Sequence, residues 1–433
     1  MDCIEAKPAV RAASHSHRIN RLGLALAGLL IAVPVAAGAA PDEEALGRDA
    51  GYPVGANLVQ AYQPRYIVGS FSAMDSIAPS CKQAPSDDPR PLEKAAPETT
   101  IRYRYRNGYY TLDDYMQHQR ATAVVVIKDG RIVAERFNYG RTAEMRMLSN
   151  SMAKTIVALG IMKALEEGKI RSLDDRAQDY LPALAGTLYG GTRLVNLMRM
   201  ASGARFVEDY SRDDDRARFN TIVRRQGVLQ AARSVSERDA PEGERFNYAG
   251  AQTSVLGLVL EAATGEPLCS WIGEKIWKPV GAAAEASWLL HPADKEAIAA
   301  GGFNATVYDY GRLGMMLADD GVVRGQTVIS REHLLDMTDA ARQPLAFRPG
   351  TMRDSHGGTY FGYGLQTWLF PGATRRFALL GIYGQAIFVD PQNKLVMVHM
   401  GVGKEASGDA SGNHFGQERD ALWRGVVATY GAW

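Results

Sequence analysis

Ser151 and Lys154 are spaced so that a hydroxyl and an amine can act together, in the segment Ser151-Met-Ala-Lys154. Residues three apart share one face of a helix, so Lys154 can reach the Ser151 oxygen. A serine becomes a good nucleophile only when a base takes its proton, and a lysine is that base only where its charged form is disfavoured. Because Met152, Ile156 and Val157 make the surroundings apolar, the segment predicts Ser151 as nucleophile and Lys154 as base.

The Ser-x-x-Lys spacing alone is weak support, because about one or two matches are expected by chance in a chain of this length. The alternative is a helix N-cap serine beside a solvated lysine. The position of the Ser151–Lys154 segment favours a catalytic role, because the segment begins an apolar helix predicted over 151–167, with Gly168 at the C-cap position. The N-terminus of such a helix also helps to stabilise an oxyanion.

Tyr248 is the second candidate, in Phe246-Asn-Tyr-Ala-Gly250 just before an apolar helix predicted over 253–262. A tyrosine at such a junction can relay protons between the lysine, the serine and the leaving group. The alternative is a core tyrosine with a satisfied hydroxyl.

The third candidate is the segment Leu380-Gly-Ile-Tyr-Gly-Gln385, predicted to open a strand over 383–389. Glycines in a strand mark a close approach of the backbone to another group, and free N–H groups on an edge strand can hold an oxyanion. The alternative is a bulge in the sheet.

The elements around these segments predict an α+β fold, with an antiparallel sheet built from both ends of the chain and a separate helical lobe. Asp129-Gly130 between two β-rich runs indicates a tight hairpin. The predicted elements are strands at 121–127, 131–137, 383–389 and 395–400, short helices over 173–274 and a final helix at 417–430.

The N-terminus has the pattern of a secretory signal. Arg18 and Arg21 precede an apolar run over 22–33, Pro34 follows it, and 37–39 reads Ala-Gly-Ala. This pattern predicts a signal peptide over 1–39, cleaved near residue 39 or 40, and a periplasmic or secreted protein. An uncleaved anchor is the alternative, although the run is short for a membrane span. Residues 40–101 are predicted to form an N-terminal arm or loops, and residues 102–433 the main domain.

Composition narrows the possible partners. The 433 residues are 46% hydrophobic and 22% charged, with a formal net charge of +1, so nothing indicates a nucleic-acid partner. After the N-terminal run, no stretch is long and apolar enough to span a membrane. The sequence has no Gly-x-Ser-x-Gly, no His-Glu-x-x-His and no close His/Cys cluster, so we expect no metal and no cofactor. Cys81 and Cys269 are free to pair in an oxidising compartment.

From Tyr103 to the C-terminus, the sequence resembles the serine β-lactamase and penicillin-recognising superfamily, and within it the esterase-like branch that includes 6-aminohexanoate-dimer hydrolase. The segments that carry the resemblance occur in the order typical of that family. They are 124–133 (Val-Val-Val-Ile-Lys-Asp-Gly-Arg-Ile-Val), 148–154 (Leu-Ser-Asn-Ser-Met-Ala-Lys), 200–203 (Met-Ala-Ser-Gly), 208–210 (Glu-Asp-Tyr), 301–306 (Gly-Gly-Phe-Asn-Ala-Thr) and 381–385 (Gly-Ile-Tyr-Gly-Gln).

The resemblance implies a β-lactamase/transpeptidase-like fold and a role for each matching residue. Ser151 would be acylated, Lys154 would deprotonate it, and Tyr248 would protonate the leaving group. The backbone N–H groups of Ser151 and Ile382 would form the oxyanion hole. The residues expected to bind substrate are Tyr210, Asn304, Trp368 and Tyr383, with ordinary packing as the alternative for Asn304 and Trp368.

Two departures from the family pattern bear on the substrate. The Tyr-x-Asn motif ends here in Gly250, and Leu379-Leu380-Gly381 stands where Lys-Thr-Gly is typical. Loss of that lysine removes a charge-assisted contact to a substrate carboxylate, worth on the order of 1.5–3 kcal/mol. We therefore predict a serine hydrolase acting on a neutral ester or a small linear amide through an acyl-enzyme. The alternatives are a β-lactamase or penicillin-binding carboxypeptidase, and a non-catalytic binding protein on the same scaffold.

Overall fold

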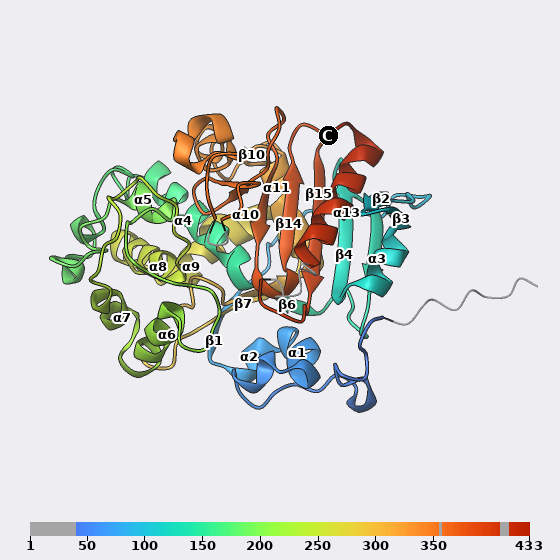
Figure 1. The fold of residues 1–433 in the computed structure, drawn as a ribbon. Helices are drawn as coiled ribbons and strands as arrows, with labels where there is room; N and C mark the ends of the chain where they lie inside the picture. Colours follow the sequence, from blue (N-terminus) through green and yellow to red (C-terminus); the bar gives the residue numbers. More distant parts are fainter. Residues whose placement is uncertain (1–39, 355–356, 408–414) are drawn as a thin grey trace, which may run out of the picture. The chain divides into compact units, whose positions relative to one another are not determined.

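The computed structural model describes residues 40–354, 357–407 and 415–433, and the predicted signal peptide lies outside them. A seven-stranded antiparallel sheet is central to this part of the chain (Figure 1). Its strands, in spatial order, are β11 (Gly362–Tyr363), β12 (Trp368–Leu369), β13 (Phe377–Leu380), β14 (Ala386–Asp390), β15 (Leu395–Gly401), β4 (Ala121–Lys128) and β5 (Arg131–Phe137).

The pairing of β15 with β4 joins the two ends of the domain, as the sequence predicted. The hairpin between β4 and β5 is also confirmed. Its turn residues Asp129 and Gly130 have φ of 50° and 77°, the left-handed conformation that a tight primed turn requires. The predicted α+β fold is therefore the observed one.

Alternate residues of the sheet enter two different cores, because successive side chains of a strand point to opposite faces. Val125 and Ile127 pack in the core that includes α11 (Val307–Ala318) and α4 (Ala153–Glu166). Val124 and Val126 pack in the core that includes α13 (Phe415–Tyr430). Both faces of the sheet are thus covered by helices, and α13 crosses one of them in Figure 1.

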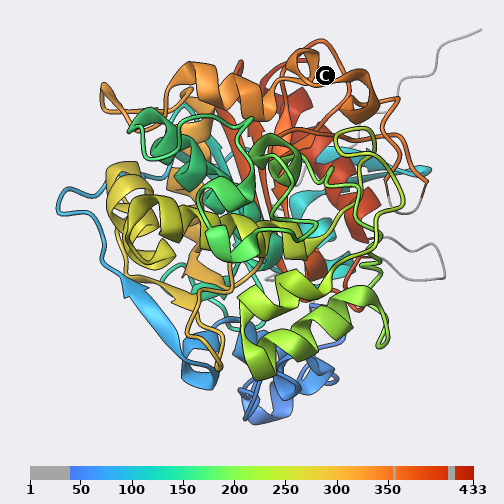
Figure 2. The same ribbon diagram turned by 90° about the vertical axis from the view of Figure 1, so that its left-hand side faces the viewer.

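A mainly helical lobe lies beside the sheet, shown in green and yellow in Figures 1 and 2. It consists of short helices separated by loops, as predicted for residues 173–274. Its helices are α5 (Leu194–Met198), α6 (Asp215–Gln226), α7 (Val228–Ser234), α8 (Gly250–Thr264), α9 (Leu268–Ile272) and α10 (Lys278–Val280). Two further α-helices lie outside this lobe, α3 (Leu112–His118) and α12 (Arg331–Thr338).

The segment 40–101 contains more regular structure than the predicted arm of loops. It forms α1 (Pro64–Phe71), α2 (Met74–Ile77) and β1 (Ser80–Gln83). Strand β1 is the edge of a four-stranded sheet with β7 (Ala286–Leu289), β8 (Phe303–Thr306) and β6 (Arg146–Leu148). Cys81 on β1 forms a disulfide with Cys269 on α9, with the sulfur atoms 2.13 Å apart. The segment is therefore fixed to the domain by strand pairing and by a covalent bond.

Two small two-stranded sheets lie outside the larger sheets. One pairs β2 (Arg102–Tyr105) with β3 (Gly108–Thr111), and the other pairs β9 (Val322–Val323) with β10 (Gln326–Thr327).

The prediction of a strand beginning at Tyr383 is wrong. Residues Ile382–Gly384 form a tight turn between β13 and β14, and Tyr383 has a φ of 62°. This turn connects two interior strands rather than opening an edge strand. A left-handed residue cannot continue a pleated strand, so β14 begins only at Ala386.

Among the described residues, no single helix has the length and apolar composition to cross a membrane. The bent pair of Gly250–Thr264 and Leu268–Val280 meets those criteria only when both parts are taken together, and most of its apolar residues are part of the buried core.

Candidate active site

Ser151 and Lys154 meet at the start of α4. Ser151 lies in a 3₁₀ turn, Asn150–Met152, and Lys154 is one turn further along, within the helix. The Lys154 amine donates a hydrogen bond to the Ser151 hydroxyl oxygen over 2.8 Å and another to the Ala300 carbonyl over 2.8 Å. Lys154 is only 3% exposed, whereas Ser151 is half-buried. The expected pair is thus within bonding distance, with the amine shielded from water and the hydroxyl accessible.

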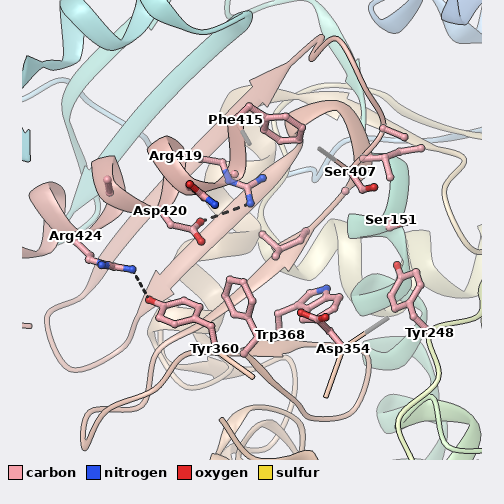
Figure 3. A pocket seen from close by; sticks show the side chains of 18 of the residues that line it. Ser151, Tyr248, Asp354, Tyr360, Trp368, Ser407, Phe415, Arg419, Asp420 and Arg424 are labelled. Atoms are coloured by element: carbon pink, nitrogen blue, oxygen red, sulfur yellow. Dashed lines mark hydrogen bonds and ion pairs between the residues drawn. The ribbon is translucent and has the colours of Figure 1, made fainter. Parts of the chain in front are cut away.

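Tyr248 lies in the loop that leads into α8. Its ring centroid is 5.1 Å from the Lys154 amine nitrogen. The ring stacks on Trp368 of β12, with centroids 5.8 Å apart and planes inclined by 25°. Figure 3 shows Tyr248 and Ser151 at the same end of a pocket that Trp368 also lines. Two segments far apart in sequence, the start of α4 and the loop before α8, thereby bring a hydroxyl, an amine and a phenol together.

The turn at Ile382 packs against the turn that carries Ser151. A Cβ atom on Gly381 would lie 2.6 Å from the Ser149 carbonyl oxygen, so only glycine permits this approach. The Asn150 amide donates to the Ile382 carbonyl over 3.2 Å. The neighbouring backbone N–H groups of Gly381 and Tyr383 donate to Gln385 and Ala406. Ile382 and Ser151 both line the pocket, which is the arrangement expected of two oxyanion donors.

Glu208 is a further residue at the site; in the sequence it belongs to the segment Glu208-Asp-Tyr210, where no signal of its own marks it as functional. Its carboxylate accepts a hydrogen bond of 2.6 Å from the backbone N–H of Gly250. Ala249, the N-cap residue of α8, makes no side-chain cap, so Glu208 supplies the negative charge at this helix N-terminus. Burial raises the pKa of Glu208, and the electrostatic interaction with Lys154 opposes part of that rise.

The contact with Glu208 also explains why the Tyr-x-Asn motif ends in glycine. A Cβ on Gly250 would lie 3.3 Å from the Glu208 carboxylate, which is closer than most real Cβ contacts. A full asparagine side chain would displace the carboxylate. Glycine at 250 and glutamate at 208 therefore form a matched pair that orients the loop carrying Tyr248.

Substitutions at Glu208 should separate its hydrogen bond from its charge. Glu208→Ala removes the acceptor for Gly250, so we expect kcat to fall by about tenfold and unfolding to become easier by about 1 kcal/mol, the usual cost of a lost cap. Glu208→Gln keeps an acceptor oxygen and should retain most of the kcat and most of the free energy of unfolding. Steady-state kinetics and thermal unfolding of the two variants measure this. Equal losses in both variants would contradict a hydrogen-bonding role and indicate that the charge matters.

Ser151 borders two cavities, and we call them the large and the small cavity. The large cavity has a volume of about 660 Å³ and is lined by Tyr248 and Trp368. The small cavity has a volume of about 210 Å³ and is lined by Lys154. Ser151 and Ile382 line both. A carbonyl attacked by Ser151 can therefore place one substituent in each.

The four residues expected to bind substrate lie in different surroundings. Tyr210 lines both cavities, and its hydroxyl donates to Glu208 over 3.4 Å. Trp368 lines the large cavity. Asn304 is 2% exposed on β8, where its amide donates to the Gly302 carbonyl, and it lines neither cavity. Tyr383 also lines neither cavity and packs against Phe71 and Tyr62. The structure brings Tyr210 and Trp368 to the nucleophile but not the other two.

Residues from the N-terminal segment also reach the site, which the sequence did not indicate. Leu58, Tyr62 and Met74 line the small cavity together with Ser151. No catalytic motif marks these positions, and only the tertiary contacts reveal them. In the part of the chain that the structure describes, no group of three or more His, Cys, Asp or Glu residues could hold a metal ion.

The fold and this arrangement define a serine hydrolase with a β-lactamase/transpeptidase-like architecture. The Beta-lactamase family model matches residues 111–415, and the chain belongs to this family.

Several known proteins are similar to the chain. The 6-aminohexanoate-dimer hydrolase of Paenarthrobacter ureafaciens is 24% identical over 346 residues, which cover 76% of this chain and 84% of that protein. A solved structure from Bacillus anthracis, provisionally named as a 6-aminohexanoate-dimer hydrolase, has a TM-score of 0.73 at 21% identity and covers 85% of this chain and 94% of that one. EstCE1, described as a hydrolase with promiscuous acyltransferase activity, has a TM-score of 0.56 at 19% identity, covering 72% and 96%.

Proposed function

We propose that this protein hydrolyses a neutral ester or a small linear amide through an acyl-enzyme on Ser151. The observation that carries the proposal is the 2.8 Å hydrogen bond from the shielded Lys154 amine to the Ser151 hydroxyl, beside two cavities. A serine nucleophile needs a base beside it, and here the amine of Lys154, a residue only 3% exposed, lies within hydrogen-bonding distance of the hydroxyl.

In the proposed mechanism, Lys154 takes the hydroxyl proton as the Ser151 oxygen attacks the substrate carbonyl carbon. The backbone N–H groups of Ser151 and Ile382 hold the oxyanion. Collapse of this intermediate breaks the bond to the leaving alcohol or amine, which receives the proton from Lys154 through Tyr248. Water then attacks the acyl-enzyme along the reverse proton path and releases the acid.

The substrate class is inferred from the residues that replace the usual cation of the family. Leu380 lines the large cavity at the position where the Lys-Thr-Gly motif has its threonine, and Leu379 stands where the motif has its lysine. Without that ammonium, a β-lactam or peptide carboxylate loses a charge-assisted contact. The name of the Paenarthrobacter ureafaciens relative, a hydrolase of the 6-aminohexanoate dimer, is in keeping with a small linear substrate. β-Lactamase and penicillin-binding activities remain the alternative for the same site.

The test compares the wild type with Ser151→Ala on p-nitrophenyl acetate. We expect a burst of nitrophenol from the wild type, equal to the enzyme concentration, and an acetylated Ser151 peptide by mass spectrometry after rapid acid quenching. The variant should show neither. Equal turnover by both proteins would remove Ser151 from the mechanism, and rapid, durable labelling of Ser151 by a fluorescent penicillin would favour the alternative.

We also propose that the protein is exported to the periplasm or secreted. The N-terminal pattern over 18–39 and the Cys81–Cys269 disulfide both support this, because disulfides persist in oxidising compartments. Expressed in a Gram-negative host, the protein should be released with the periplasmic fraction, and its first residue by Edman sequencing should be close to Pro41. Full-length protein retained in the cytoplasm would contradict the proposal.

A further inference from the structure

We propose that the small cavity binds the acyl group of the substrate, and that the N-terminal segment closes this cavity and limits the acyl chain to a short one. This inference rests on the proposed function, since it requires acylation of Ser151. It assigns substrate selectivity to Leu58, Tyr62 and Met74, which precede the residues matched by the family model.

The side of Ser151 on which the acyl group lies follows from the proton path. When the carbonyl oxygen is held by the N–H groups of Ser151 and Ile382, the acyl chain and the leaving group must extend in different directions. Tyr248 lines the large cavity but not the small one. A group that protonates the leaving atom must lie beside it. The leaving group therefore occupies the large cavity, and the acyl chain occupies the small one.

The wall of the small cavity is fixed by specific contacts. The Tyr62 hydroxyl donates to the Asn150 side-chain oxygen over 3.2 Å, next to the nucleophile. The Tyr62 ring packs against Phe71 and Tyr383, with centroids 5.2 and 5.6 Å away. Met74 is only 2% exposed. Because β1 pairs with β7 and carries the disulfide to α9, the segment that holds this wall is anchored at its far end as well.

The sizes of the two cavities set the expected selectivity. The small cavity, at about 210 Å³, lies below the roughly 300–1,000 Å³ that is typical of pockets for drug-sized ligands. The large cavity, at about 660 Å³, lies within that range. We therefore infer a substrate with a short acyl chain and a bulkier alcohol or amine portion.

Arg216 and His291 are two of the polar residues that line the small cavity. Arg216 contacts Asp214 over 3.3 Å and lies 5.3 Å from the Tyr210 ring centroid. Burial lowers the pKa of His291 to about 4, so its imidazole is neutral at physiological pH. The aliphatic and aromatic side chains of the N-terminal segment thus face a cavity in which Arg216 is paired with a carboxylate and His291 is uncharged, which suits an alkyl acyl chain.

The experiment measures kcat/KM for p-nitrophenyl acetate, butyrate and octanoate. The wild type should prefer the two shorter esters. Leu58→Ala and Tyr62→Ala should each raise the octanoate-to-acetate ratio by about tenfold or more, because each methylene moved from water into an apolar site favours binding by about fourfold. Tyr62→Phe keeps the ring but removes the hydrogen bond to Asn150, so its ratio should stay as in the wild type. Val59→Ala is the matched control, since Val59 is 78% exposed and lines neither cavity.

An unchanged ratio in both Leu58→Ala and Tyr62→Ala, with thermal unfolding showing folded proteins, would overturn the inference. The inference would also be overturned if these variants instead raised the ratio of kcat/KM for octyl acetate to kcat/KM for ethyl acetate. That result would place the leaving group in the small cavity. Either result leaves the proposed function intact as long as Ser151→Ala abolishes acetate hydrolysis. Loss of the proposed function would appear as activity that survives in Ser151→Ala.

Discussion

Replacing Lys154 by methionine should lower kcat/KM for p-nitrophenyl acetate by about 10³, within the range that a positioned base contributes. The change removes the amine that donates to Ser151 and Ala300 but keeps an unbranched side chain of similar length in a site that is 3% exposed. The burst of nitrophenol should disappear, because the serine hydroxyl has lost its proton acceptor. Stopped-flow and steady-state measurements at the same pH report both effects.

Two further variants make the Lys154 result specific. Lys154→Arg retains the positive charge, but a guanidinium does not act as a base near neutral pH, so the variant should be as inactive as Lys154→Met. Lys163→Ala changes a lysine on the same helix that contacts Glu166 and the Val328 carbonyl, and it should hydrolyse the ester like the wild type. If Lys154→Arg kept more than about a tenth of the activity, proton transfer to this residue would be excluded as the main role.

Gly381→Ala should lower kcat by about 10²–10³, which is the usual cost of losing one oxyanion donor. The added Cβ would lie 2.6 Å from the Ser149 carbonyl, a backbone atom, so the chain must move and carry the neighbouring Ile382 N–H with it. We expect the effect in kcat rather than in KM, because the donor acts on charge that develops in the transition state.

Gly273→Ala is the matched control for Gly381→Ala. A Cβ at Gly273 would meet only the Gln83 side chain, at 3.5 Å or more, and the residue lines neither cavity. This variant should retain wild-type kcat. A Gly381→Ala enzyme with full kcat would show that Ile382 does not supply an oxyanion contact. Circular dichroism measures the folded fraction of the variant, and kcat is calculated from the concentration of folded protein.

Local patterns were sufficient to predict much of the fold. The Asp129-Gly130 turn, the apolar run after Ser151 and the strand over 395–400 each carry their own signal, because turn chemistry and side-chain periodicity act over a few residues. The Ser151–Lys154 pair belongs to this group, since helical geometry fixes its spacing. The predicted strand over 383–389 begins three residues later, at Ala386, because a left-handed residue at Tyr383 is not evident from residue type.

The sequence by itself determined the class of fold, the proximity of Ser151 and Lys154 and the absence of the usual Lys-Thr-Gly cation, because each depends on residue identity and short-range spacing. Only the tertiary structure brought Tyr248, Glu208 and Tyr62 to that pair. Only the tertiary structure turned Asn304 and Tyr383 away from both cavities. These outcomes depend on contacts between elements separated by up to hundreds of residues, and no local pattern encodes which faces of those elements will meet.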